Sequence, residues 1–328
     1  MSRRICVGFI GCGGISHGHA QRLRDVPEAQ ITALMDVDGD RLRVFQERNP
    51  ETKDCPVFFD HKEMLDKAEL DAVEIHSPHT AHFQQIMDAL DRGLHVLVEK
   101  PMVCRTKDAR QVVDKAEQTG KVVLVSYQRH YQPQFRYVRE AIASGAVGKV
   151  QFVSAFQCQN WYNSQRGKWR QDPVLSGGGQ LNDSGSHLVD VILWVTGLSV
   201  TELSGYVDNL DTEVDINSAL SLKFNNGAEG NISVVGNASV FWEDLSFLGT
   251  EGAIFLRNGK LSHAPHDGKV FEPTELPTGP ANADANFIYA ILGREEVQSP
   301  PIGGLRVIEL TEAAWESGRT GRPVKVAA

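Results

Sequence analysis

A lysine stands where an apolar run ends abruptly, at residues 96–101 (sequence VLVEKP). The three apolar residues favour a buried parallel strand, and a charged pair followed by a proline then ends it. In an open α/β sheet, ligands bind in the crevice beyond the carboxyl ends of the strands. We therefore expect Lys100 at the rim of a ligand site, on a backbone that Pro101 restricts. The alternative is a surface turn with a solvated lysine.

A glycine-rich turn at residues 11–16 (GCGGIS) follows the first predicted strand and opens a helix. Gly11 permits the tight turn and Gly13 lets the backbone approach a pyrophosphate, while the helix start adds free N–H groups and a positive dipole. Asp36 ends the second strand, 20 residues after Ser16, which is the spacing of a carboxylate that binds ribose hydroxyls. The pattern predicts a dinucleotide site, with Gly14 and Ile15 also in the turn; a glycine-rich turn without ligand is the alternative.

Asp36 also bears on the choice of cofactor. A 2′-phosphate carries about −1.5 to −2 charges, and a carboxylate at ~4 Å would repel it by on the order of several kcal/mol. The sequence therefore favours NAD. NADP stays possible, because Arg41 is near enough to reach a phosphate.

A carboxylate and an imidazole lie four residues apart after three glycines, at residues 177–187 (GGGQLNDSGSH). If residues 179–196 form one helix, Asp183 and His187 share a face. A carboxylate beside an imidazole fixes its tautomer and raises its basicity, as general acid–base catalysis requires. A buried ion pair bracing the helix is the alternative. A metal site that adds His79 and His82 is a further one, but we predict no metal, because hydride chemistry needs none.

The elements that must position these residues fall into two groups. From residue 4 to 127, apolar runs alternate with helical patterns, which predicts a doubly wound parallel sheet. After residue 127, short alternating runs joined by turn residues predict antiparallel hairpins. The predicted strands are 5–10, 31–35, 57–59, 72–76, 94–98, 122–126, 150–157, 202–207, 218–224, 228–234, 244–248 and 253–256; the helices are 15–24, 39–48, 61–67, 80–92, 105–119, 134–143, 179–196, 282–293 and 303–317.

We therefore predict an α/β protein of two domains: a dinucleotide-binding Rossmann domain at 1–127 and a substrate-binding and oligomerisation domain at 128–328. A net charge of −9 argues against a nucleic-acid binder, and no apolar run approaches the ~20 residues of a membrane span. The run at 5–10 continues into glycines rather than a cleavage site, so we interpret it as a strand and not a secretion signal. Five scattered cysteines fit a reducing cytoplasm.

Taken together, these motifs resemble the glucose–fructose oxidoreductase / inositol dehydrogenase (Gfo/Idh/MocA) family. The likeness covers nearly the whole chain and includes residues 77–82 (SPHTAH), 168–170 (KWR) and 317–323 (SGRTGRP). Ser16, in place of a third glycine, is the main departure. The resemblance implies a Rossmann domain followed by an α/β domain with an open, mostly antiparallel sheet. It also implies a nicotinamide cofactor, commonly a cis Lys–Pro bond, and a homodimer or homotetramer built through the outer face of that sheet.

The family's residues carry over by position. Lys100, Asp183 and His187 match its catalytic trio. We assign His187 as acid/base, Lys100 as donor to the reacting oxygen and Asp183 as orienter, although the first two roles could be exchanged. The predicted cofactor site combines positions that match cofactor-contacting positions of the family with residues close to them. These residues are Gly11, Gly13, Gly14, Ile15, Asp36, Arg41, Ser77, His82, Glu99, Lys100, Gln128, Trp169 and Arg170.

The substrate pocket should draw on aromatic, amide and cationic side chains, a mixture that suits a polyol, sugar or cyclitol. We predict an NAD(P)-dependent dehydrogenase or ketoreductase in the cytoplasm. Two alternatives are a redox-assisted glycosidase with tightly bound NAD and a non-enzymatic dinucleotide sensor, although sensors often lose the trio. For the adjacent Trp161 and Tyr162, simple packing is as good an interpretation as substrate contact. The predicted pocket residues beside the trio are Arg129, His130, Asn160, Trp161, Tyr162 and Arg170.

Overall fold

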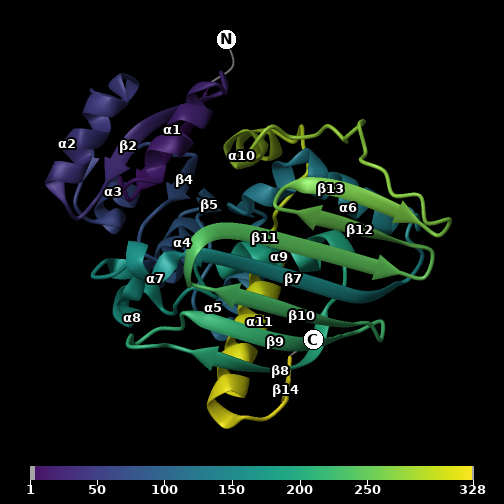
Figure 1. Ribbon diagram of the computed structural model, residues 1–328. Coiled ribbons are helices and arrows are strands. Elements are labelled where there is room, and N and C mark those ends of the chain that lie inside the picture. Colours follow the sequence, from purple (N-terminus) through teal and green to yellow (C-terminus); the bar gives the residue numbers. More distant parts are fainter. Residues whose placement is uncertain (1–3, 327–328) are drawn as a thin grey trace. The chain divides into compact units, whose positions relative to one another are not determined.

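The computed structural model describes residues 4–326 of the chain. The chain forms two compact units (Figure 1). The first comprises residues 4–103, 107–128 and 280–302, and the second comprises 104–106, 129–279 and 303–326. Residues 280–302 thus pack in the first unit, although the predicted second domain includes them. Each unit is described by itself.

The first unit is built on a six-stranded parallel sheet with the strand order β3-β2-β1-β4-β5-β6. Sequential strands run outward from β1 in both directions, which confirms the predicted doubly wound arrangement. Nearly all residues of the central strands are buried, because helices cover both faces of such a sheet. The strands are β1 (Ile5–Ile10), β2 (Ala29–Met35), β3 (Val57–Phe58), β4 (Ala72–Ile75), β5 (His95–Val98) and β6 (Val123–Val125).

The helices of this unit begin at local signals in the sequence. Asp38 and Asp60 cap α2 and α3 by accepting the backbone N–H groups of Asp40 and Glu63. The last helix, α10, comes from the far end of the chain and packs against α1, β5 and β6. The helices are α1 (Ser16–Arg24), α2 (Gly39–Arg48), α3 (His61–Lys67), α4 (His82–Asp91), α5 (Thr106–Thr119) and α10 (Ala283–Ile291), with 3₁₀ turns η1 (Pro50–Thr52), η2 (His79–Ala81) and η3 (Gln128–Tyr131).

The second unit contains an eight-stranded sheet with the order β13-β12-β11-β7-β10-β9-β8-β14. Every neighbouring pair is antiparallel except β7 and β10, which are parallel. The mixed, mostly antiparallel sheet confirms the expected fold class. The strands are β7 (Val150–Asn160), β8 (Val200–Asp208), β9 (Asn217–Phe224), β10 (Glu229–Val235), β11 (Asn237–Gly249), β12 (Gly252–Arg257), β13 (Lys260–Pro265) and β14 (Val324–Lys325).

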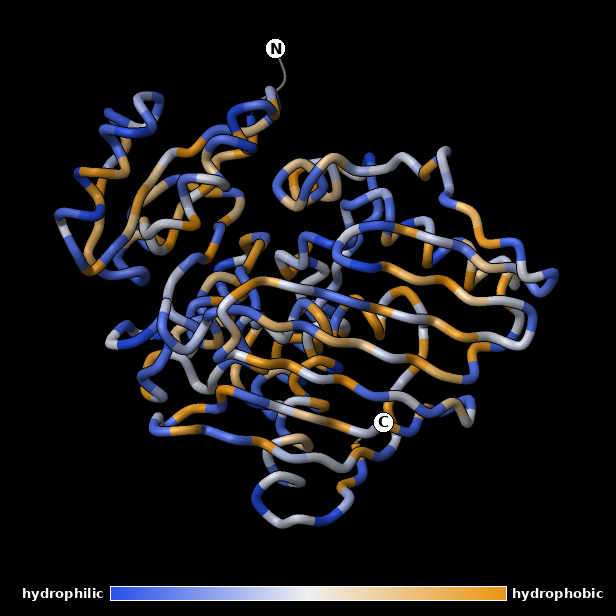
Figure 2. The backbone as a smooth tube through the Cα atoms, viewed as in Figure 1, coloured by the Kyte–Doolittle hydropathy of each residue, from blue (hydrophilic) through white to orange (hydrophobic). Residues whose placement is uncertain are grey.

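One face of this sheet packs against helices and carries the core of the unit. In β9, Leu220, Leu222 and Phe224 are buried while the residues between them are exposed, as a strand covered on one side requires. Figure 1 shows α9 and α11 behind the sheet, and Figure 2 shows the alternation of hydrophobic and hydrophilic residues along its strands. The helices are α6 (Pro133–Ala143), α7 (Trp161–Ser164), α8 (Pro173–Ser176), α9 (Gly185–Thr196) and α11 (Pro301–Thr320), with the 3₁₀ turn η4 (Trp169–Gln171).

The sequence prediction differs from the structure mainly in the second unit. Helix α9 begins at Gly185 rather than at 179, because residues 177–184 form turns that other groups hold. Strand β11 is 13 residues long and includes an exposed, irregular first half that period-two patterning missed. In the described part of the chain, 4–326, no helix is both long enough and apolar enough to cross a bilayer.

Candidate active site

The glycine-rich turn of the first unit leaves its backbone open. A Cβ atom on Gly13 or Gly14 would meet nothing within 4 Å, so a ligand can approach the backbone there. Gly11 has φ +94°, and a Cβ on it would lie 2.8 Å from the backbone of His76. Ser16, which replaces the third glycine, is buried, and its hydroxyl donates to the Gly13 carbonyl at 2.6 Å. The substitution therefore closes the turn and leaves the open backbone unobstructed.

Asp36 lies beside this turn as predicted and is 4% exposed. Its Oδ2 accepts the backbone N–H of Cys12 at 2.8 Å, and its Oδ1 accepts that of Asp38 at 3.0 Å. An ionised carboxylate has about four acceptor positions, so two hydrogen bonds leave capacity for ribose hydroxyls. Val37 is 77% exposed and Ile15 is 42% exposed, which offers apolar surface for a flat base. These residues fit a dinucleotide.

Arg41 lies next to the same carboxylate. Its Nη1 is 3.9 Å from Asp36 Oδ1, and its Nε is 3.5 Å from Asp38 Oδ2. About half of the Arg41 side chain is exposed, so it reaches solvent above the turn. Its predicted contact with cofactor stays a prediction.

The loop after β4 is braced by His82. This buried ring points Nδ1 at the Pro101 carbonyl (2.9 Å) and Nε2 at the Ser77 carbonyl (3.0 Å), so it connects the loops that follow β4 and β5. Burial lowers the pKa of His82, and the two carbonyls oppose that effect. The Ser77 hydroxyl donates to Gln85 at 2.6 Å. His79 is also buried, with its ring 5.9 Å from that of His82.

Lys100 follows β5 as predicted, in a turn that Glu99 organises. Glu99 Oε2 accepts the backbone N–H of Lys100 at 3.2 Å, and the other oxygen of Glu99 bonds to His19 Nε2 at 3.0 Å. The Lys100–Pro101 bond is cis, as the resemblance implied. Lys100 is partly exposed, at the carboxyl end of the parallel sheet.

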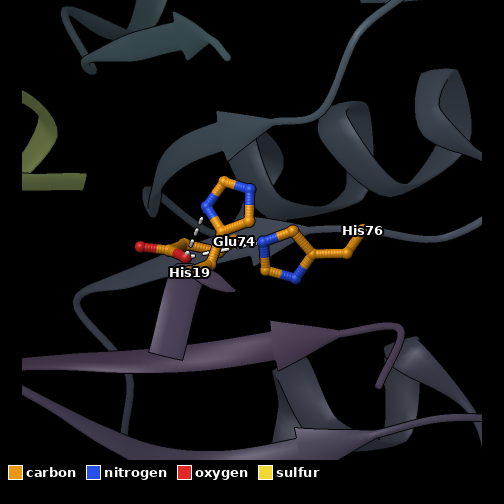
Figure 3. Close-up of side chains that lie close together, drawn as sticks. All are labelled: His19, Glu74 and His76. Atoms are coloured by element: carbon orange, nitrogen blue, oxygen red, sulfur yellow. Dashed lines mark ion pairs between the residues drawn. The ribbon is translucent and has the colours of Figure 1, made fainter. Parts of the chain in front are cut away.

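A buried group of charged side chains that the sequence analysis missed lies directly behind this turn. His19 of α1 bonds through Nδ1 to Asp284 Oδ1 of α10 at 2.7 Å, and Arg22 Nε bonds to the other oxygen of Asp284 at 2.5 Å. Glu74 of β4 approaches His19 at 3.7 Å and His76 at 3.5 Å (Figure 3). Nothing in the local pattern could have shown this, because Asp284 is 265 residues from His19.

Charge and burial set the protonation of this group. Burial alone would lower the pKa of His19, but Asp284 and Glu99 outweigh it and raise the pKa to about 10. Burial likewise would raise the pKa of Glu99, yet the hydrogen bond and charge of His19 hold it well below its ordinary range. Burial and the charge of Asp284 raise the pKa of Glu74 to about 8. Burial keeps the pKa of His76 well below its usual value.

His19, Glu74 and His76 each offer a ligand atom within 4.8 Å of the others, and in the described residues this is the grouping with metal-binding chemistry. Both ring nitrogens of His19 already bond to carboxylates, however. Coordination through His19 would therefore have to break a charge-assisted hydrogen bond. We assign no metal to this grouping.

In the second unit, Asp183 precedes helix α9 and His187 lies in its first turn. The predicted helix over 179–196 is therefore wrong in its first six residues, and Asp183 and His187 are not two positions of one helical face. Asp183 is 4% exposed and His187 is half-buried. The closeness of the two residues in sequence still positions both at the amino end of α9.

Two neighbours hold Asp183. Its Oδ2 accepts the indole N–H of Trp161 at 2.7 Å and pairs with Arg170 Nε at 3.0 Å. Trp161 is 3% exposed and packs with Val214 and Ile216. This indole thus supports the candidate catalytic carboxylate, while a substrate contact for Trp161 stays a prediction.

The last of the three glycines before Asp183 is required by packing. A Cβ on Gly179 would lie 1.9 Å from the backbone oxygen of Asp215. The buried carboxylate of Asp215 accepts the backbone N–H groups of Gly179 (2.9 Å) and Leu181 (2.7 Å) and the indole N–H of Trp315 (2.9 Å). Burial raises the pKa of Asp215 even though these hydrogen bonds oppose it. These contacts hold 177–184 as turns and stop α9 from starting earlier.

Arg129 and His130 lie next to helix α9. Arg129 donates to the His187 backbone carbonyl at 3.3 Å and forms an ion pair with Glu243. His130 bonds to Asp190 at 2.8 Å and stacks on Trp194. Arg129 is thus held in place beside His187, while buried His130 is engaged within the core.

The other predicted residues are distributed as follows. Asn160 ends β7, is exposed and accepts a hydrogen bond from Asn163 at 2.9 Å. Tyr162 donates its hydroxyl to Asp211, and Arg170 stacks over Trp169 at 4.4 Å. Gln128 is exposed at the start of η3, in the first unit.

Comparison with known families identifies both parts of the chain. Residues 5–127 match the model of the oxidoreductase family with an NAD-binding Rossmann fold (GFO_IDH_MocA), and residues 135–255 match the GFO/IDH/MocA C-terminal domain. The chain belongs to the GFO/IDH/MocA family. It is accordingly an NAD(P)-dependent oxidoreductase, as the sequence analysis predicted.

Two relatives in this family are named for an inositol and for a sugar. The chain is 26% identical to scyllo-inositol 2-dehydrogenase (NAD(+)) of Bacillus subtilis over 273 residues, which is 80% of this chain and 76% of that protein. It is 24% identical to D-apiose dehydrogenase of Paraburkholderia graminis, over 99% of this chain and 90% of that protein.

Solved structures share the fold along the whole chain. Levoglucosan dehydrogenase in complex with NADH and L-sorbose gives a TM-score of 0.88 at 19% identity, covering 99% of this chain and 100% of that one. The WlbA dehydrogenase of Bordetella pertussis in complex with NADH and UDP-GlcNAcA gives 0.85 at 23% identity, covering 99% and 100%.

Proposed function

We propose that this family member transfers a hydride between nicotinamide and a secondary alcohol or ketone of a sugar, sugar derivative or cyclitol. One observation carries the proposal. The chain has an amine, Lys100, after β5, at the same edge of the parallel sheet as the open glycine turn, and a held carboxylate and an imidazole, Asp183 and His187, at the start of α9. These are the groups that alcohol oxidation needs. The names of the relatives, inositol and apiose dehydrogenases, support the substrate class.

The residues divide the work. When bound, the nicotinamide accepts or supplies the hydride. His187 takes the hydroxyl proton, because imidazole has an ordinary pKa near neutrality (~6.5). Lys100 donates a hydrogen bond to the reacting oxygen, and Asp183, fixed by Trp161 and Arg170, orients the hydroxyl. The proposal includes the reverse assignment, in which Lys100 takes the hydroxyl proton and His187 donates the hydrogen bond.

NAD is the proposed cofactor, because Asp36 faces the position where the ribose would bind and would repel a 2′-phosphate. The partner we propose is a second copy of the chain, in a dimer or tetramer built on the outer face of the eight-stranded sheet. Tyr206 on that face is 86% exposed. Molar mass in solution, measured by light scattering, tests the assembly.

The experiment that tests the function is a screen of sugars and inositols with NAD and with NADP, followed by absorbance of the reduced nicotinamide. Lys100→Met and His187→Ala should each lower turnover by at least ~10²-fold while cofactor still binds. Lys107→Met and His266→Ala are matched controls, because both side chains are exposed and outside the proposed site. Full activity of Lys100→Met or His187→Ala would refute the role of that residue.

A further inference from the structure

We propose that His19 is a positioning residue for Lys100: as an imidazolium it holds the Glu99 carboxylate in place and balances its charge beside the lysine. The inference rests on the proposed role of Lys100. It assigns a role to a side chain that is fully buried in the first unit. A single residue, Glu99, connects this side chain to the turn that bears the amine.

The geometry of His19 is that of a charged ring. Nδ1 meets Asp284 Oδ1 at 2.7 Å and Nε2 meets Glu99 Oε1 at 3.0 Å, and a neutral imidazole has one N–H to donate. Both ionised carboxylates therefore receive a hydrogen bond only when both ring nitrogens are protonated. The raised pKa of His19, about 10, agrees with this reading.

Charged groups face His19 from every element packed around it. Glu99 follows β5 and Asp284 is on α10. Glu74 lies in β4 and His76 directly follows that strand (Figure 3), while Arg22 is on α1 itself. The His76 ring lies 4.3 Å from that of His19 and is uncharged, because burial keeps its pKa low. With Glu74 protonated, two carboxylates face two cations, Arg22 and His19. The group is then neutral overall.

Glu99 transmits the effect to Lys100. One of its oxygens bonds to His19 and the other accepts the backbone N–H of Lys100 at 3.2 Å, so the imidazolium fixes the carboxylate that shapes the lysine turn. Without the imidazolium, Lys100 would be the main cation left to balance the buried Glu99 carboxylate, which favours the ammonium form of the amine. A pH-dependent step that involves the amine should then move to higher pH.

The first test is His19→Gln, which keeps an N–H donor and loses the charge. The kcat/KM profile should shift to higher pH by about one unit on the limb set by the amine, and kcat should fall about tenfold, with cofactor affinity little changed. His17→Gln is the matched control: His17 lies on the same helix, half-buried against Phe45, and its variant should keep the wild-type profile.

The second test is rescue by charge. In the double variant H19Q/E99Q both charges are gone. The limb of the kcat/KM profile that the amine sets should therefore return to its wild-type pH, even if kcat stays low. An unmoved limb in H19Q, an equal shift in H17Q, or a limb that E99Q does not restore would each overturn the proposal. If H19Q does not fold, Asp284→Asn removes one acceptor and should move the same limb by a smaller amount.

A third measurement needs no substrate. The ring nitrogens of His19, observed by ¹⁵N NMR in histidine-labelled protein, should keep the imidazolium signature from pH 6 to above pH 8. Titration of His19 near its ordinary value, about 6.5, would overturn the inference. A protein that oxidises no sugar or inositol would refute the proposed function instead, and the histidine signal would still decide the charge of His19.

Discussion

The carboxylate of Asp36 binds two backbone N–H groups of its own unit, those of Cys12 and Asp38. It therefore shapes the glycine-rich turn before any cofactor arrives. We propose that the same group recognises the ribose of the cofactor, and Arg41 lies 3.9 Å away from it. The Asp36 carboxylate would repel a 2′-phosphate, whereas the Arg41 guanidinium would attract it. The repulsion should dominate, because the carboxylate is fixed and buried.

Asp36→Ser should lower the preference for NAD. Removal of the carboxylate takes away the repulsion of a 2′-phosphate and leaves Arg41 available to pair with it, so kcat/KM with NADP relative to NAD should rise about tenfold or more. Steady-state kinetics with both cofactors measure the ratio. Asp40→Ser, on the exposed side of α2, is the control and should leave the ratio unchanged. An unchanged ratio in Asp36→Ser would rule out the proposed discrimination.

Residues at strand ends were predictable from the sequence, and those that depend on distant partners were not. Lys100 and Asp36 follow apolar strands, so the parallel sheet fixes where they lie. His19 has no such signal, because its meaning depends on Asp284 in a segment 265 residues away. For Trp161, the sequence supported substrate contact and packing equally, because its hydrogen bond to Asp183 depends on the tertiary fold.

The turns that lead into helix α9 depend on a single buried carboxylate. Asp215 accepts two backbone N–H groups, from Gly179 and Leu181, and the indole N–H of Trp315. Its backbone fills the space that a side chain at Gly179 would need. The position of the helix start, and with it that of Asp183 and His187, therefore follows from a residue in the loop before β9.

Asp215→Asn should loosen this element. The amide supplies one acceptor oxygen and turns an NH₂ group toward N–H donors, which leaves at least one buried donor unpaired at a cost of about 1–3 kcal/mol. The thermal midpoint should fall by several degrees, and kcat should fall about tenfold with a smaller change in KM. Asp208→Asn, at the exposed end of β8, is the control. If kcat of Asp215→Asn equals that of wild type, the carboxylate does not position Asp183 and His187.

At the scale of elements, the first unit was predictable and the second only in outline. All six parallel strands and helices α2 and α3 lie within a few residues of their predicted ranges, because buried apolar runs and caps are local signals. Helix α9 was predicted to start too early because its first residues are held from outside by Asp215. The parallel pairing of β7 with β10 could not be predicted, since both alternate like hairpin strands.

At the scale of the whole molecule, a group of buried titratable side chains in the first unit has shifted pKa values, which makes stability depend on pH. His19 and Glu74 have folded-state pKa values raised to about 10 and about 8. A raised pKa gives stability below the unfolded value that is lost as pH rises through the folded one. The lowered pKa values of Glu99 and Asp284 act at the acidic end, where stability is lost as pH falls.

The free energy of unfolding should therefore be greatest at mildly acidic pH and fall between pH 6 and pH 9. Urea unfolding at a series of pH values measures this, through the midpoint of the transition that reports on the first unit. Glu74→Gln cannot ionise, so the decline from pH 6 to pH 8 should flatten. Glu63→Gln, an exposed carboxylate on α3, should retain the wild-type decline. A wild-type decline in Glu74→Gln would exclude Glu74 as its source.

The origin of helix α10 has a consequence for how the protein is made. The helix belongs to the nucleotide-binding unit, yet it is encoded after most of the other one, and it brings the carboxylate that pairs with Arg22 and His19. During synthesis on the ribosome, residues 4–128 emerge long before Asp284. Until residue 302 has left the exit tunnel, the nascent unit carries two cations without that counterion. Its folding should therefore finish last, after the later-encoded sheet has largely formed.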